Sequence, residues 1–137
     1  MSVKRQTAST SADMHVERGD ASVEAVLLVP VVFLMFLLGV QCAATFHAGS
    51  VATAAAAQGA VAAAAFGAGP INGERAATVS AIELGATLVG APVVAFSPRD
   101  VQVSVTLRVP QIVPGFPESL TRSAIESREE FIAERDR

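Results

Sequence analysis

A long stretch without charged side chains constrains this sequence more than any other feature. No Asp, Glu, Lys or Arg occurs between Glu24 and Glu74, and residues 25–40, AVLLVPVVFLMFLLGV, contain no strongly polar side chain. Residues as far as Phe46 are tolerable near a membrane interface, so the segment reaches the ~20 residues that cross a bilayer. Its backbone must be helical, because hydrocarbon offers no partner for an unpaired peptide group. The sequence therefore predicts one transmembrane helix.

Basic residues lie on one side of this segment. Lys4, Arg5 and Arg18 precede it, whereas the next basic residue after it is Arg75. By the positive-inside rule, the N-terminus is predicted to lie in the cytoplasm and the C-terminal region outside it. Pro30 lies within the segment and removes one backbone hydrogen bond, so we expect it to kink the helix. The predicted location is the cell membrane, with a single pass.

An alanine-rich stretch follows at residues 47–66 and favours helix. We expect the transmembrane helix to continue through it, to extend outside the membrane, and to end at the glycines and proline of residues 67–70. Small side chains permit close helix packing, whereas an uncharged helix is poorly solvated. Two interpretations stay open, namely a packing arm buried by other subunits and an inert alanine tract. The positions expected to pack are Gly39, Ala43, Ala52, Ala56, Gly59 and Ala63.

The sequence beyond residue 70 is typical of a small globular region. A helix is predicted from Asn72, acting as its N-cap, to about Val89. Spacing of the larger apolar residues indicates one apolar stripe along this helix. The stripe comprises Val79, Ile82, Ala86 and Val89.

Two strands are predicted after that helix. Residues 93–96 are β-prone, residues 97–100 indicate a turn, and residues 101–109 alternate strictly, which places the odd-numbered ones on one face. A proline-rich loop at 110–117 ends the second strand, and the sequence leaves open whether the tail at 118–137 is helix or strand. The predicted fold class is α+β, with a long transmembrane helix that extends outside the membrane, followed by a small extracytoplasmic helix plus β-hairpin region.

Composition and spacing exclude several classes of function. A formal net charge of −3 is too small to indicate a nucleic-acid partner. The single Cys42 cannot form an internal disulfide, and Gln41 stands where a lipoprotein signal needs a small residue. His15 and His47 lie on opposite sides of the predicted membrane. Metal-ligand spacing, a phosphate-binding glycine loop and a nucleophile with a base are all missing from the sequence. We expect no enzyme activity, metal, cofactor or small-molecule substrate.

Glu24 lies at the edge of the apolar run and allows two interpretations. It can be a first-turn carboxylate at the positive end of the helix dipole, with Asp20 and Ser22 as caps. It can also be a carboxylate that is tolerated at this depth because it meets a cationic partner during assembly. The residues themselves leave both interpretations open.

Residues 18–40, RGDASVEAVLLVPVVFLMFLLGV, resemble the start of TadE-like proteins, the minor pseudopilins of tight-adherence (Flp-type, type IV) pilus systems. In that family a short basic leader ends in Gly, a Glu follows five residues later, and a Pro interrupts the apolar run. Gly19, Glu24 and Pro30 stand at these positions. Residues 54–65, AAAAQGAVAAAA, resemble the family's Ala and Gly segment after the span. The resemblance implies that a prepilin peptidase cuts after Gly19 and leaves Asp20 as the new N-terminus.

The resemblance implies a non-catalytic pseudopilin that supports assembly of an adhesion pilus through helix packing. The implied partners are the membrane, the prepilin peptidase, other pilins or pseudopilins, and the pilus assembly platform. Residues 1–19 are then a cytoplasmic leader, residues 20–66 the transmembrane and extended helix, and residues 67–137 the extracytoplasmic region. The alternative is a small binding domain, either released from a signal helix or held on an anchor helix. An A-x-A site at 52–54 lies too far beyond the apolar run for the usual signal-peptide geometry.

Overall fold

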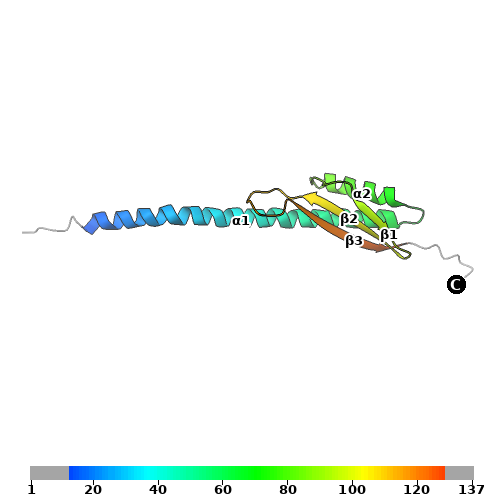
Figure 1. Ribbon diagram of the computed structural model, residues 1–137, viewed down its shortest axis with the longest axis horizontal. Coiled ribbons are helices and arrows are strands. Elements are labelled where there is room, and N and C mark those ends of the chain that lie inside the picture. The colour runs from blue at the N-terminus through cyan, green and yellow to red at the C-terminus, as the bar shows by residue number, and fades with distance from the viewer. Residues whose placement is uncertain (1–12, 129–137) are drawn as a thin grey trace, which may run out of the picture. The chain divides into compact units, whose positions relative to one another are not determined.

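The described part of the chain contains two helices and three strands. The computed structural model describes the backbone of residues 13–128 and the side chains of residues 24–128. The chain divides into two compact units, one ending at Leu38 and one beginning at Gly39. The predicted α+β class with a long N-terminal apolar helix is confirmed. The elements are α1 (Asp13–Ala64), α2 (Pro70–Glu83), β1 (Val93–Phe96), β2 (Asp100–Arg108) and β3 (Ser119–Ser127) (Figure 1).

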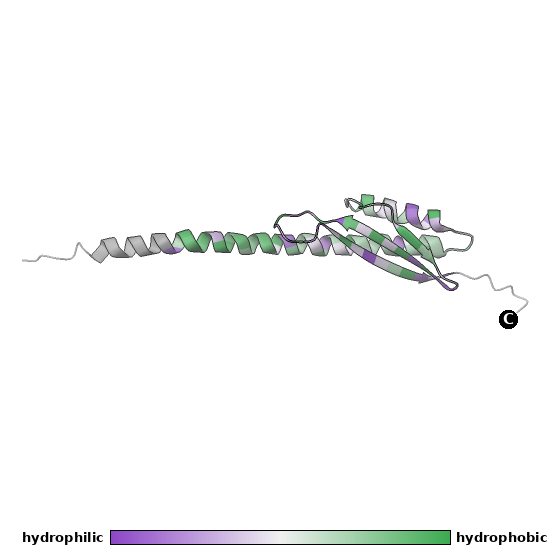
Figure 2. Ribbon diagram, viewed as in Figure 1, coloured by the Kyte–Doolittle hydropathy of each residue, from purple (hydrophilic) through white to green (hydrophobic). Residues whose placement is uncertain are grey.

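The first unit contains the most apolar part of α1, which Figure 2 shows as a nearly continuous green segment. Among the described residues most of its Val, Leu and Phe side chains are exposed, Phe33 to 59% and Phe36 to 65%. So much uncovered apolar surface is unfavourable in water and favourable in hydrocarbon. Within the described residues α1 is the one helix long and apolar enough to cross a membrane. It runs through Pro30 without interruption, and the kink that we expect there stays a prediction.

Helix α1 ends at Ala64, close to the predicted end near Phe66. Gly67 follows with a φ of 76°, in the left-handed region where glycine is favoured because it has no Cβ. The Ala68 N–H donates to the Ala65 carbonyl at 3.0 Å, which closes a turn. Pro70 then occupies the first turn of α2, where its missing N–H leaves no helix bond unmade.

The second unit, which we call the head, contains a three-stranded antiparallel sheet in the order β1-β2-β3. Val101 pairs with Phe96 of β1 and with Glu126 of β3. Both predicted strands are confirmed, and the unsettled tail contributes β3, whereas residues 129–137 lie outside the described part. The alternation along β2 is also confirmed, because its odd-numbered residues are all buried. They are Val101, Val103, Val105 and Leu107, followed by Val109 just after the strand.

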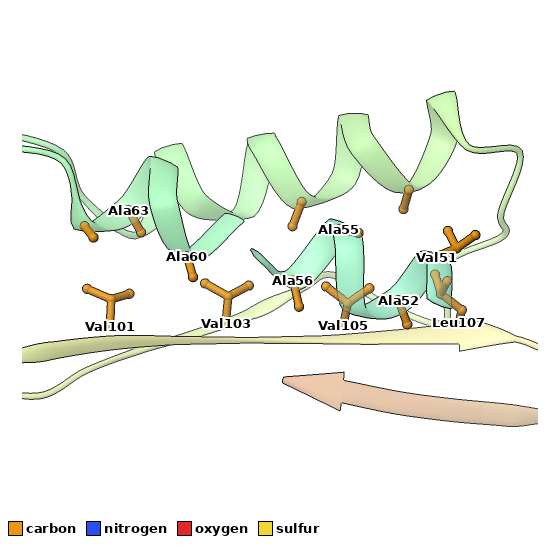
Figure 3. Close-up of a cluster of buried hydrophobic side chains, with 13 residues drawn as sticks. Val51, Ala52, Ala55, Ala56, Ala60, Ala63, Val101, Val103, Val105 and Leu107 are labelled. Atoms are coloured by element: carbon orange, nitrogen blue, oxygen red, sulfur yellow. The ribbon is translucent and has the colours of Figure 1, made fainter. Parts of the chain in front are cut away.

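The core of the head lies between β2 and the alanine-rich end of α1. Figure 3 shows Ala52, Ala56 and Ala60 of the helix facing the row of β2 side chains that includes Val103 and Val105. Side chains as small as alanine let the helix backbone lie close to the sheet, and valines fill the remaining space. The alanine tract is therefore the inner layer of a folded domain over this face.

Helix α2 differs from its prediction. It ends at Glu83 and not near Val89, and its buried residues are Gly73, Ala77 and Ala81. The predicted apolar stripe was wrong, because Val79 is 47% and Ile82 is 62% exposed, while Ala86 and Val89 lie beyond the helix. The physical reason is the close approach of α2 to α1. Only glycine and alanine fit between the two backbones, so the larger residues point away.

Candidate functional site: helix α1 and the surfaces around it

The N-terminal part of α1 carries the predicted processing and assembly residues. Gly19 and Asp20 lie in the helical backbone, and their side chains are outside the described part. Glu24 is exposed, and no cation among residues 24–128 pairs with it. Pro30 is exposed two turns further along. The roles predicted for these four residues stay predictions, since nothing in the fold tests them.

The six predicted packing positions lie in two environments. Ala52, Ala56, Gly59 and Ala63 are buried in the chain's own core. Ala43 is exposed, and a Cβ added to Gly39 would meet nothing within 4 Å. The head thus covers one face of the alanine-rich helix and leaves another open to solvent. That open face comprises Ser50, Thr53, Ala54, Gln58 and Val61.

Helices α1 and α2 approach each other closely at two glycines. A Cβ added to Gly59 would lie 2.8 Å from the Ala77 Cβ and 2.8 Å from the Gly73 carbonyl oxygen. A Cβ added to Gly73 would lie 2.7 Å from the Ala63 Cβ and 2.9 Å from the Gly59 carbonyl oxygen. Backbone atoms cannot move aside as a flexible side chain can, so both positions require glycine. This crossing fixes α2 on the alanine-rich part of α1.

Gln41 joins α1 to the loop between β2 and β3. The side chain is fully buried, although it follows directly on the apolar run. Its Oε1 accepts hydrogen bonds from the backbone N–H groups of Ile112 at 2.7 Å and Val113 at 3.2 Å. Its Nε2 donates to the Pro110 carbonyl at 3.2 Å. Both lone pairs of the amide oxygen are therefore used, and the loop is held against the helix.

The loop that Gln41 holds covers residues 109–118 and is closed at its base. The Val109 N–H donates to the Glu118 carbonyl at 2.8 Å. Within the loop, the Gln111 side chain donates to the Phe116 carbonyl at 3.0 Å, and Gly115 has a φ of 95°. A Pro-Gly pair with this glycine conformation is typical of a tight turn. The loop is thus shaped by its own hydrogen bonds as well as by Gln41.

A shallow groove runs between α1 and β3 on the open side of the head. Its volume is about 470 Å³. Its lining includes Cys42, Phe46, Thr53, the half-buried Phe116 and Arg122. Gly49 also lines it, and a Cβ added there would be 3.7 Å from Nη2 of Arg122. We name this feature the α1–β3 groove, a mostly apolar channel with the Arg122 guanidinium beside Gly49.

Side chains that could perform chemistry are dispersed over the described residues. Among them, His, Cys, Asp and Glu form no group of three that could hold a metal ion. Cys42 is a free, exposed thiol. His47 lines a small hollow with Arg108 and Pro110. Such a dispersed arrangement is suited to packing against other surfaces.

Sequence reasoning missed three residues that organise this region. Gln41 was considered only as an obstacle to a lipoprotein signal, yet a lone amide directly after an apolar run indicates a group that needs a buried partner. Gly73 was overlooked inside the second helix, where a glycine signals close approach of another backbone. Arg122 gave no signal, because its place beside Gly49 depends on the pairing of β3 with β2.

The fold and its surfaces define a class of protein. One apolar helix, long enough to cross a membrane, continues as the inner helix of a small α+β head, which fits a single-pass membrane protein. Residues 19–61 match the family model of the TadE-like protein. This match confirms the resemblance carried by Gly19, Glu24 and Pro30, and it relates the segment to proteins of the tight-adherence pilus. No curated protein and no solved structure matches the chain.

Proposed function

We propose that this protein is a pseudopilin-like subunit that supports assembly of a tight-adherence pilus by helix packing, without catalysis. The observation that carries the proposal is the family match, which begins at Gly19, the last residue of the inferred leader, and ends at Val61. The matched segment thus joins the apolar helix to the alanine-rich helix that organises the head. In this proposal the N-terminus lies in the cytoplasm, the head lies outside it, and the partners are other pilins and the assembly platform.

The proposed assembly step depends on a new charge at the N-terminus. Cleavage by a prepilin peptidase after Gly19 gives Asp20 a free α-amino group, with an ordinary pKa of about 8, that is cationic at neutral pH. An isolated charge among apolar helices is costly, on the order of several kcal/mol, unless an opposite charge neutralises it. Glu24 of a neighbouring subunit supplies that opposite charge. The exposed state of Glu24 in the single chain leaves it accessible for this role.

The alternative is a small binding domain released from a signal helix. Cleavage after Ala54, the last residue of the A-x-A site, would remove Val51 and Ala52, which are buried in the core of the head. It would also remove Gln41, which holds the loop. A released domain would therefore lose part of the interior on which its fold depends, and this argues against release, whereas a binding domain held on an anchor helix stays open as the alternative.

The processing step is tested by determining the mature N-terminus. In cells that contain the prepilin peptidase, mass spectrometry should show that the wild-type chain begins at Asp20. Gly19→Phe should keep the full-length chain, because a bulky side chain obstructs entry of the backbone into a peptidase cleft. A wild-type chain that retains Met1, or that begins near Ala55, would contradict the proposed processing.

The assembly step is tested separately with Glu24→Ala. This variant should be cleaved as the wild type is, while its recovery in pilus or partner fractions falls. The matched control is Glu24→Asp, which keeps the carboxylate and should restore recovery at least in part. Normal recovery of the cleaved Glu24→Ala chain would contradict the charge-pairing role and leave the other interpretation, in which Glu24 is a first-turn carboxylate at the helix dipole.

A further inference from the structure

The loop at residues 109–118 carries apolar side chains that the head does not cover. Ile112 is 41% exposed, and Pro114 and Pro117 are exposed as well. No charged residue occurs between Arg108 and Glu118. Loops that face water are normally rich in polar residues, and an uncovered apolar patch indicates an interaction surface.

Gln41 determines the depth at which that loop lies relative to a bilayer. A helix needs about 20 residues to cross the hydrocarbon, so a span that begins at Glu24 ends near residue 44. Gln41 therefore belongs to the last turn of the span. Because its amide binds Pro110, Ile112 and Val113 directly, the loop lies at the same depth. That depth is the boundary between acyl chains and headgroups.

We propose that the loop at 109–118 inserts into the lipid leaflet at which α1 leaves the membrane. The head then has two attachments to the bilayer, the span itself and the apolar loop held by Gln41. This inference rests on α1 crossing a bilayer and is independent of the role in a pilus.

The hydrogen bonding of the loop suits an apolar environment. Backbone N–H groups that enter lipid need partners, and the three prolines of the loop have no N–H to satisfy. The N–H groups of Ile112 and Val113 bond to Gln41, and that of Val109 bonds to the Glu118 carbonyl. These bonds also stabilise Gln41, because a side-chain amide without hydrogen-bond partners at this depth would cost free energy. Gln41 and the loop residues Ile112 and Val113 thus satisfy part of each other's hydrogen bonding where water is scarce.

The charges around the loop agree with phospholipid as the partner. Arg122 lines the α1–β3 groove beside Gly49, which is about two helical turns beyond Gln41. Arg108 and His47 line the hollow next to Pro110. Both arginines therefore lie on the headgroup side of Gln41, while Glu118 is the acidic group at the base of the loop. The apolar side chains of the loop would then face the acyl chains and the basic side chains would face the headgroups, which matches the layering of a leaflet.

The test uses single tryptophans in the full-length chain, which contains no Trp or Tyr of its own. Ile112→Trp places the reporter in the loop, and the chain is reconstituted in phosphatidylcholine vesicles that are brominated near the headgroup end of the acyl chains. Quenching needs contact with the lipid, so we expect it to be roughly twofold or more stronger than for a reporter held in water. Both leaflets carry bromine, so the orientation of the chain in the vesicle does not matter.

Two matched reporters make the result decisive. Ile125→Trp lies on the outer face of β3, where Ile125 is 63% exposed, and should emit as a water-exposed ring with little quenching. Leu34→Trp lies in the span and should be quenched by lipids brominated deep in the chain. If Leu34→Trp is quenched while Ile112→Trp behaves like Ile125→Trp, the loop does not insert and the proposal is overturned. An unquenched Leu34→Trp would overturn the bilayer crossing on which the inference depends.

The positioning role of Gln41 has its own readout. Gln41→Met keeps the length and bulk of the side chain but can neither accept from Ile112 and Val113 nor donate to Pro110. Quenching of Ile112→Trp should fall in this background, while the Ile125→Trp emission stays as before if the sheet remains folded. Undiminished quenching of Ile112→Trp in the Gln41→Met chain would show that Gln41 does not set the depth of the loop.

Discussion

Gly59 and Gly73 show how much a single missing Cβ contributes to this fold. At each position the nearest obstacles are an alanine Cβ and a backbone carbonyl oxygen of the facing helix, neither of which can turn aside, so a methyl group cannot be accommodated by turning a side chain. We expect Gly59→Ala to push α2 away from α1 and to lower the free energy of unfolding of the head by roughly 1–3 kcal/mol. Chemical unfolding of the full-length chain in detergent micelles, followed by circular dichroism, measures this loss.

The control for Gly59 is the same substitution at Gly39. An added Cβ at Gly39 meets nothing within 4 Å, and the residue lies inside a helix. Gly39→Ala should therefore be neutral or should stabilise the helix by about 0.5–1 kcal/mol, because alanine loses less backbone entropy than glycine. Equal effects of the two substitutions would show that close packing at Gly59 is not what makes glycine necessary there.

At the scale of the element, α1 has an inner face that belongs to the head and an open face that does not. Val61 is 56% exposed on the open face, whereas Ala56 is fully buried against the sheet. A lysine at position 61 can extend into water, so Val61→Lys should leave folding and membrane insertion unchanged. If the open face packs on other pilins, the charge will reduce co-purification with them, because a desolvated lysine without a partner is costly.

Ala56→Lys is the contrasting variant for this surface. It puts a charge inside the core, where we expect it to unfold the head and to abolish protease resistance. Loss of partner recovery in Ala56→Lys therefore says nothing about the open face. If Val61→Lys is recovered with pilus partners as well as the wild type is, the open face is not the packing surface.

Elements with a strict period were predictable from the sequence. The alternation at 101–109 identified both β2 and its buried face, and the charge-free run identified the apolar helix, because each pattern follows from a backbone repeat. The tail remained undecided because β3 has only a half-buried inner row, with Leu120 and Ala124 as its apolar members. Such a strand shows little alternation by itself, and its register comes from pairing with β2.

The surroundings of α1 were less predictable than α1 itself. Large apolar residues such as Val79 and Ile82 were expected to face the core, yet the core between the helices is built from glycine and alanine. Which residues of α2 are buried depends on how closely its backbone approaches that of α1. That distance cannot be predicted from a single sequence. The contact between Gln41 and the loop joins residues far apart in the chain, so it was equally invisible to local patterns.

At the scale of the whole molecule, the basic residues predict an orientation that can be measured. Lys4, Arg5 and Arg18 precede the span, and the next basic residue is Arg75. A reporter enzyme that is active only outside the cytoplasm should therefore be active when it is fused after Arg137. The same reporter fused before Met1 is the control and should be inactive. The reverse pattern would refute the orientation and the pseudopilin proposal with it.

The head also includes the part of α1 that begins at Gly39, and truncated chains test whether its folding needs that part. A chain of residues 39–137 retains Gln41 and the whole inner face of the alanine-rich helix, whereas residues 55–137 lack Ala48, Val51 and Ala52, all of which are buried. Removing buried apolar groups costs both their transfer free energy and the cavity that they leave. We expect residues 39–137 to melt cooperatively and residues 55–137 to show no cooperative transition by circular dichroism.

The outcome separates an anchored subunit from a released domain. A head that needs residues from Gly39 onwards cannot be freed by cleavage near Ala54, since the cut would divide its own core helix. The control is the 39–137 chain with Gln41→Met, which loses the bonds to Ile112 and Val113 but keeps the core alanines. It should still melt cooperatively, at a somewhat lower temperature. A cooperative transition in residues 55–137 would instead mean that the sheet and α2 suffice, and it would restore the released binding domain as the leading alternative.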